Sequence, residues 1–134
     1  MDTAVILECK KLSLEGKITF PEVVKRLLQA GVELYHVDLI KQRATYYGEQ
    51  KQTLDTDFSL SQLPVVSDVF DAQAVAQSVK RSQKREIDYV TFITEVMKAG
   101  TYAYTAYLKG KRVAYLGKMG EMHIEHFPQA PSQP

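Results

Sequence analysis

Two of the three histidines of the chain lie close together in the stretch MHIEHFP, residues 122–128. Side chains two residues apart in a strand project from the same face, so His123 and Glu125 would share a face and His126 would lie on the other. A histidine beside a carboxylate can bind a divalent metal ion, or act as a general acid–base pair near neutral pH. This stretch is therefore the first candidate for a functional site.

A second pair occurs in the stretch YHVDL, where His36 and Asp38 would share one face of a strand. Two histidines and two carboxylates suit zinc or a similar divalent ion, provided that the two pairs approach each other in the fold. The structural alternative is that each histidine hydrogen-bonds a neighbour or lies at a solvated edge. The candidate ligand site consists of His36, Asp38, His123, Glu125 and, as a weaker member, His126.

The sequence contains an internal repeat at an offset of 69 residues, because residues 18–48 align with residues 87–117 without a gap. The elements of the two copies would position the two histidine–carboxylate pairs. The identities fall at the same helix ends, strand centres and turns in both segments. We therefore predict two copies of one unit, roughly 2–58 and 71–127, joined by residues 59–70. The identical pairs within the segments include Gly31/Gly100, Tyr35/Tyr104, Leu39/Leu108, Arg43/Arg112, Tyr46/Tyr115 and Gly48/Gly117.

Each copy is predicted to contain two helices followed by three strands. Thr19 and Glu22 have the spacing of a capping box at the start of the second helix, and Asp88 occupies the equivalent position of the second copy. The helices are expected at 2–14, 19–30, about 67–85 and 88–99, and the strands at 32–40, 43–48, 52–58, 101–108, 112–117 and 121–127.

The predicted fold class is α+β, an internal duplication of an ααβββ unit that forms an antiparallel sheet with helices packed on it. Residues 1–128 would form a single domain, and residues 129–134 a disordered tail. Tyrosines at matched positions of the two copies are assigned to core packing with satisfied hydroxyls. His36 and Asp38 align with Thr105 and Tyr107, so this pair is unique to one copy, as expected either for a site acquired after duplication or for drift.

Composition excludes several classes of function. The chain has 134 residues, 17 basic and 16 acidic, so its net charge of +1 gives no field that would attract nucleic acid or an anionic membrane. Cys9 is the single cysteine and is expected to be buried in a helix. A cytoplasmic protein that binds neither nucleic acid nor membrane is predicted, and no phosphate-binding or nucleophile motif is present.

The motifs GVELYHVDL, TYY and GEMHIEHFP resemble those of a bacterial family that occurs in prophage regions. Its members are often labelled "phage envelope protein" and otherwise treated as a domain of unknown function. The resemblance covers most of the chain and implies an α+β domain without an assigned activity.

Two functional hypotheses follow. The first is a non-catalytic binding or interaction module, an accessory protein of bacterial or prophage origin with a protein or a small molecule as its partner. The alternative is a metal-binding or acid–base enzyme that uses the His/Asp/Glu cluster, with a zinc-like divalent ion as the possible cofactor. The absence of a catalytic motif, the balanced charge and the duplicated fold favour the first hypothesis, and the sequence leaves the oligomeric state open.

Overall fold

A computed structural model describes residues 1–128 of the chain, in which four helices and six strands follow one another in the order ααβββ, twice. Residues 129–134, predicted as a disordered tail, lie outside the described residues. The elements are α1 (Thr3–Leu14), α2 (Phe20–Gln29), β1 (Leu34–Asp38), β2 (Arg43–Tyr47), β3 (Thr53–Asp57), α3 (Ala72–Gln83), α4 (Tyr89–Lys98), β4 (Thr101–Tyr107), β5 (Arg112–Gly117) and β6 (Met122–His126).

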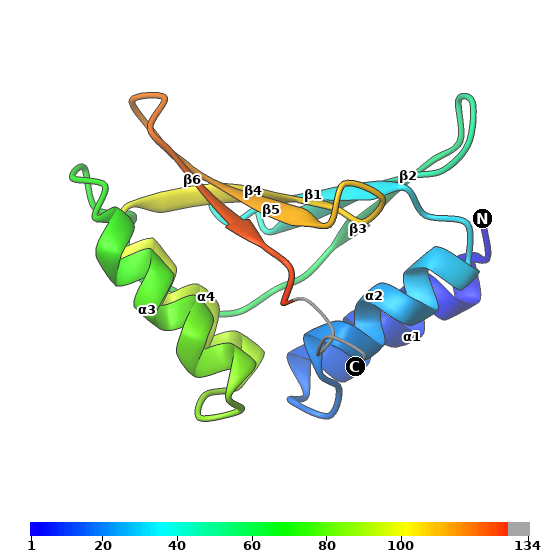
Figure 1. Cartoon of the computed structure of the whole chain (residues 1–134), viewed down its shortest axis with the longest axis horizontal. Helices are drawn as coiled ribbons and strands as arrows, with labels where there is room; N and C mark the ends of the chain where they lie inside the picture. The colour runs from blue at the N-terminus through cyan, green and yellow to red at the C-terminus, as the bar shows by residue number, and fades with distance from the viewer. Residues whose placement is uncertain (129–134) are drawn as a thin grey trace, which may run out of the picture.

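The six strands form one antiparallel sheet in the order β3-β2-β1-β4-β5-β6. Both helix pairs lie on the same side of this sheet, as Figure 1 shows, and the two pairs stand apart next to the sheet and approach each other away from it. The predicted α+β class, an antiparallel sheet with helices packed on it, is confirmed. The sheet thus has an inner face, which the helices cover, and an outer face.

Strands β1 and β4 join the two halves of the sheet with a symmetric register. His36 lies opposite Thr105, and these residues are separated by 69 positions, the offset of the sequence repeat. On either side of this pair, Leu34 lies opposite Tyr107 and Asp38 opposite Ala103. The halves are therefore related by an approximate local twofold axis at His36 and Thr105. Descent of both halves from one duplicated unit stays a prediction, as do the domain boundaries.

The helix starts differ in detail from those expected. The Asp88 carboxylate caps α4 by accepting a hydrogen bond from the Thr91 amide, as predicted. Thr19 is the N-cap residue of α2 but makes no side-chain capping bond, and Glu22 pairs with Arg26 instead. The predicted capping box is therefore wrong.

The third helix is shorter than the predicted range of about 67–85. It begins only at Ala72, because the Asp71 carboxylate accepts a hydrogen bond from the Ala74 amide and caps it there. The preceding residues 59–70 contain neither helix nor strand.

Strand β1 is also shorter than the range 32–40. It ends at Asp38, whose carboxylate accepts hydrogen bonds from the amides of Ile40 and Lys41, at 3.0 and 2.9 Å. This arrangement is the local turn that aspartate favours, and it competes with continuation of the strand.

The core lies between the inner face of the sheet and the helices. Leu27 of α2 and Val96 of α4, which are 69 residues apart, are both fully buried. Helices α2 and α4 are followed by Gly31 and Gly100, which adopt positive φ angles of 89° and 99° and end them as predicted. Within the described residues, every helix is too short or too polar to cross a bilayer.

Candidate functional site

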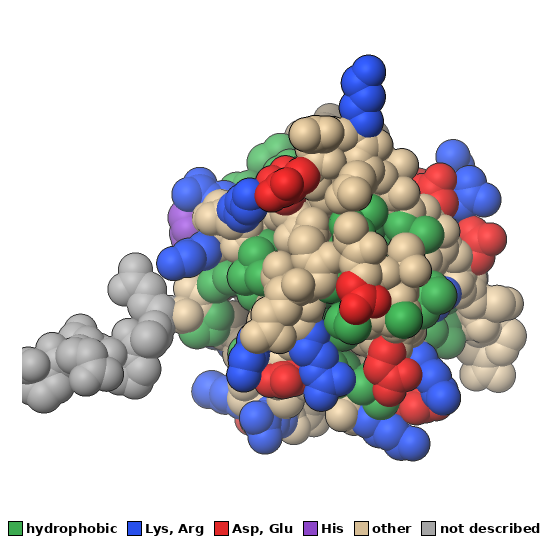
Figure 2. Space-filling view, turned by 90° about the vertical axis from the view of Figure 1, so that its right-hand side faces the viewer, with side chains coloured by type: hydrophobic (Ala, Val, Ile, Leu, Met, Phe, Trp, Pro, Cys, Tyr) green, Lys and Arg blue, Asp and Glu red, His purple; other side chains and the backbone are tan. Residues whose placement is uncertain are grey.

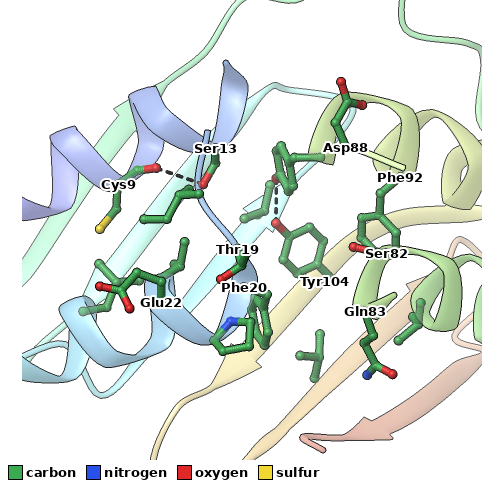
Figure 3. A pocket seen from close by; sticks show the side chains of 18 of the residues that line it. Cys9, Ser13, Thr19, Phe20, Glu22, Ser82, Gln83, Asp88, Phe92 and Tyr104 are labelled. Atoms are coloured by element: carbon green, nitrogen blue, oxygen red, sulfur yellow. Dashed lines mark hydrogen bonds between the residues drawn. The ribbon is translucent and has the colours of Figure 1, made fainter. Parts of the chain in front are cut away.

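The two helix pairs and the inner face of the sheet line an open cavity of about 840 Å³. All four helices contribute to its walls, and strands β1, β2, β4 and β5 form its floor. Figure 3 shows the cavity from close by, with Thr19 and Phe20 on one side, Ser82 and Phe92 on the other, and Tyr104 between them. The cavity lies where the two helix pairs stand apart next to the sheet, which continues beneath both.

Four tyrosines dominate the floor: Tyr35, Tyr46, Tyr104 and Tyr115. Strand alternation places each of them on the inner face, and all are at least 94% buried. The rings of Tyr35 and Tyr46 are stacked, with centroids 5.3 Å apart, and those of Tyr104 and Tyr115 lie 5.8 Å apart. The prediction that these residues pack in the core is therefore correct but incomplete, because they also line a cavity.

The tyrosine hydroxyls remain protonated over the ordinary pH range. Burial raises the pKa of Tyr35, Tyr46, Tyr104 and Tyr115, and it raises the pKa of Tyr89 to about 12. The Tyr89 and Tyr104 hydroxyls are 2.6 Å apart and share a hydrogen bond, which Figure 3 shows as a dashed line to Tyr104. The floor therefore presents aromatic rings and neutral hydroxyl groups.

The polar residues of the walls come from both helix pairs. Ser13 of α1 and Ser82 of α3 are 69 residues apart and line the cavity from its two sides. The Ser13 hydroxyl donates a hydrogen bond to the backbone oxygen of Cys9. Burial raises the pKa of the Cys9 thiol, which keeps it protonated and poorly reactive. At the mouth, the rings of Phe20 and Phe127 meet edge to face at 5.3 Å.

The first histidine–carboxylate pair lies away from this cavity. His36 Nδ1 is 2.7 Å from the Thr105 hydroxyl across the β1–β4 boundary, on the outer face of the sheet. Asp38 is on the same face, as predicted, but its carboxylate is engaged with the backbone amides of the following turn. Each side chain thus has a local structural partner.

The second pair lies on the inner face. His123 Nε2 is 2.9 Å from a Glu125 carboxylate oxygen, and the His123 ring stacks on Tyr115 with a centroid distance of 6.4 Å. Glu125 lines the cavity, while His126 lies opposite Arg112 at its rim and is exposed. Phe127 is partly buried and packs against the core. Glu125 is therefore part of the cavity wall, and His123 holds its carboxylate from beside the cavity.

The structure does not bring the two histidine–carboxylate pairs together. Strands β4 and β5 separate β1 from β6, which corresponds to about 14 Å at the usual strand spacing, and the pairs occupy opposite faces. In residues 1–128, no three or more His, Cys, Asp or Glu side chains are grouped so that they could hold a metal ion. The zinc-like site that the sequence suggested thus has no geometric support among these residues.

The sequence did not predict the cavity. The periodic apolar residues of each helix indicated a packed core, and no periodicity shows how far apart two helix pairs stand. One signal was present: four tyrosines at matched positions carry hydroxyl groups, which a sealed core would have to satisfy individually. Four such hydroxyl groups on one face of the sheet are more easily satisfied beside an accessible cavity than in a sealed core.

These observations define the class of the protein: an α+β fold with a large aromatic cavity between two helix pairs and one sheet. The chain belongs to a protein family of unknown function, DUF1398, whose family model matches residues 55–126. The match begins in β3 and ends at the last residue of β6, so it includes α3, α4 and the floor residues Tyr104 and Tyr115. A search of curated proteins finds no match to the chain.

Proposed function

We propose that this protein is a non-catalytic binding module that holds a small, largely apolar molecule in the cavity between its helix pairs. The observation that carries this proposal is the cavity of about 840 Å³ with a floor of four tyrosine rings. Ligand sites of proteins typically have volumes of about 300–1,000 Å³, with mostly apolar walls and a few polar groups that orient the ligand. The cavity matches that description in size and in lining.

A role as an accessory protein of bacterial or prophage origin, acting in the cytoplasm, is part of the same proposal. Its support is the resemblance of the motifs around His36 and His123 to those of a prophage-associated family. The single, buried Cys9 is compatible with a reducing compartment, because it forms no disulfide within the described structure.

Native mass spectrometry of the untagged protein, purified from cells, tests this proposal. The wild type is expected to retain a small molecule of a few hundred daltons, and Ser82→Phe, which fills the cavity from α3, is expected to lose it. Gln77→Phe is the matched control, since Gln77 is exposed on the same helix and does not line the cavity. Circular dichroism confirms that each variant is folded.

A molecule retained equally by wild type and Ser82→Phe would place binding elsewhere. If the wild type retains nothing, aromatic probes added to the purified protein replace the natural ligand. Cavity binding is then contradicted if no probe responds to the Ser82→Phe substitution.

The alternative function, a metal-binding or acid–base enzyme, has less support. It requires His36 or Asp38 to act together with His123 or Glu125, and these residues lie on opposite faces of the sheet. Of these residues, Glu125 lines the cavity, and the ring of its partner His123 stacks on Tyr115.

A further inference from the structure

We infer that the cavity selects an uncharged ligand with a flat aromatic ring system. This inference rests on the proposed function and adds the chemical class of the ligand. It follows from three features of the cavity: the balance of charge around it, the partners of its ionisable side chains, and the geometry of the rings on its floor.

The charges around the cavity balance. The lining contains four basic and four acidic side chains. The floor adds no charge, because its tyrosines are buried and protonated. The cavity therefore has no net charge that would attract an ion of either sign.

Several ionisable groups of the walls have partners within the described structure. Glu22 pairs with Arg26 at 3.1 Å, and Glu125 pairs with His123 at 2.9 Å. The Asp88 carboxylate accepts the hydrogen bond that caps α4. A charged ligand would lose its hydration on entering and would have to compete with these contacts, a transfer that is unfavourable without a new partner.

Aromatic ring faces attract cations, so a cationic ligand is the main alternative to an uncharged one. Here the ring faces are partly taken up by one another. Tyr35 and Tyr46 stack at 5.3 Å, and Phe92 meets Tyr115 edge to face at 6.0 Å. Glu125, whose carboxylate acts on Tyr115, is already paired with His123, so it is not free to balance the charge of a bound cation.

The ring geometry favours a flat ligand. The floor is a row of rings held by four adjacent strands, and further rings, those of Phe20, Phe92 and Phe127, line the walls. Aromatic rings prefer offset-stacked or edge-to-face partners, and an edge-to-face approach by a planar molecule leaves the contacts between the floor rings in place. The neutral hydroxyl groups can donate hydrogen bonds to a carbonyl oxygen or a ring nitrogen of the ligand.

A matched set of probes tests the charge preference. N-phenyl-1-naphthylamine is uncharged, and 1-anilino-8-naphthalenesulfonate has the same ring skeleton with one added sulfonate. A trimethylammonium derivative of naphthalene supplies the cationic member. Binding is measured by fluorescence for the first two and by displacement of the uncharged probe for the third. The chain contains no tryptophan, so the probe signal is not obscured by indole emission.

The uncharged probe is expected to bind with a Kd at least tenfold lower than those of both charged probes. Ser82→Phe, and separately Ser13→Phe on the opposite wall, should weaken its binding at least tenfold, while Gln77→Phe should leave it unchanged. Two blocking variants on different helix pairs keep the test valid if one of them fails to fold.

The outcomes separate this inference from the proposed function. If a charged probe binds as tightly as the uncharged probe, or more tightly, and both blocking variants abolish its binding, the ligand class is wrong and the cavity remains a binding site. If neither blocking variant changes the binding of any of the three probes, the proposed function itself fails.

Discussion

At the scale of single residues, two histidine–carboxylate pairs of similar spacing have different surroundings. His36 is hydrogen-bonded to Thr105 on the outer face, whereas His123 is bonded to Glu125 and stacked on Tyr115 on the inner face. The two imidazoles therefore have structural partners of their own and no shared ligand site. The hydrogen bonds occupy Nδ1 of His36 and Nε2 of His123, so a metal ion at either ring would bind through the other nitrogen, without the second histidine as a ligand.

Thermal melts with added zinc test this conclusion. We expect zinc to leave the melting temperature of the wild type unchanged. The double variant His36→Ala/His123→Ala should melt several degrees lower, because each side chain loses one buried or half-buried hydrogen bond worth about 1 kcal/mol. A zinc-dependent rise in the wild type that is absent from the double variant would restore the metal site.

The sequence predicted that His123 and Glu125 share one face of β6, but it did not indicate whether that face is the inner or the outer face of the sheet. In β6 the apolar residues Met122 and Ile124 alternate with His123 and Glu125, and apolar residues usually face the core. The structure has the reverse arrangement, with Met122 58% and Ile124 37% exposed. Pairing with β5 places His123 and Glu125 on the inner face, because His123 lies opposite the buried Tyr115.

At the scale of elements, the two halves of the chain cap the starts of the equivalent helices α2 and α4 differently. Asp88 caps α4 through its carboxylate, and the hydrogen bond with the Thr91 amide lowers the pKa of that carboxyl. Thr19 occupies the corresponding position of α2 without a capping bond. The order of the helices and strands was predictable from the periodic apolar residues, whereas the cap geometry depends on side-chain rotamers that the sequence does not specify.

Substitutions at these two positions should therefore have unequal effects. Asp88→Ala should lower the free energy of unfolding by about 1 kcal/mol, the usual loss for a charged or polar N-cap, and Thr19→Ala by clearly less. Chemical denaturation of both variants at neutral pH measures the difference. The Asp88 contribution should also decrease as the pH falls through the lowered pKa of its carboxyl, since the folded state then loses its preference for the ionised form. Equal losses for the two variants would contradict the observed capping.

At the scale of the whole molecule, the buried tyrosines connect stability to alkaline pH. Below about pH 10 these hydroxyls are protonated in both the folded and the unfolded chain, so they add no pH dependence. Above that pH the unfolded chain ionises first, because burial raises the pKa values in the folded state. Stability must therefore decrease as the pH rises. The residues concerned are Tyr35, Tyr46, Tyr89, Tyr104 and Tyr115.

Each of these tyrosines should reduce the free energy of unfolding by about 1.4 kcal/mol per pH unit once the unfolded chain is ionised. We expect cooperative unfolding within about two pH units above pH 10. Tyrosinate absorbance and far-ultraviolet circular dichroism, recorded together, check this prediction. Ionisation of all tyrosines before any loss of secondary structure would show that the cavity floor is open to solvent.

The overall architecture was more predictable than the candidate site. The helices and strands expected at 19–30, 88–99, 32–40 and 101–108 are present, with Tyr35 and Tyr104 buried on the inner face of the sheet. The separation of the helix pairs depends on packing between distant segments, which no local pattern contains. Basic and acidic side chains are interspersed on the surface shown in Figure 2, in keeping with the balanced composition.

The symmetric register of β1 and β4 has a consequence for assembly. A ladder centred on His36 and Thr105, two positions related by the repeat offset, could form equally well between two copies of the chain. What favours pairing within one chain is the connection of residues 59–70, because a short linker holds its ends at an effective concentration on the order of millimolar. A shortened connection would remove that advantage, and the halves would then exchange between molecules as a domain-swapped dimer.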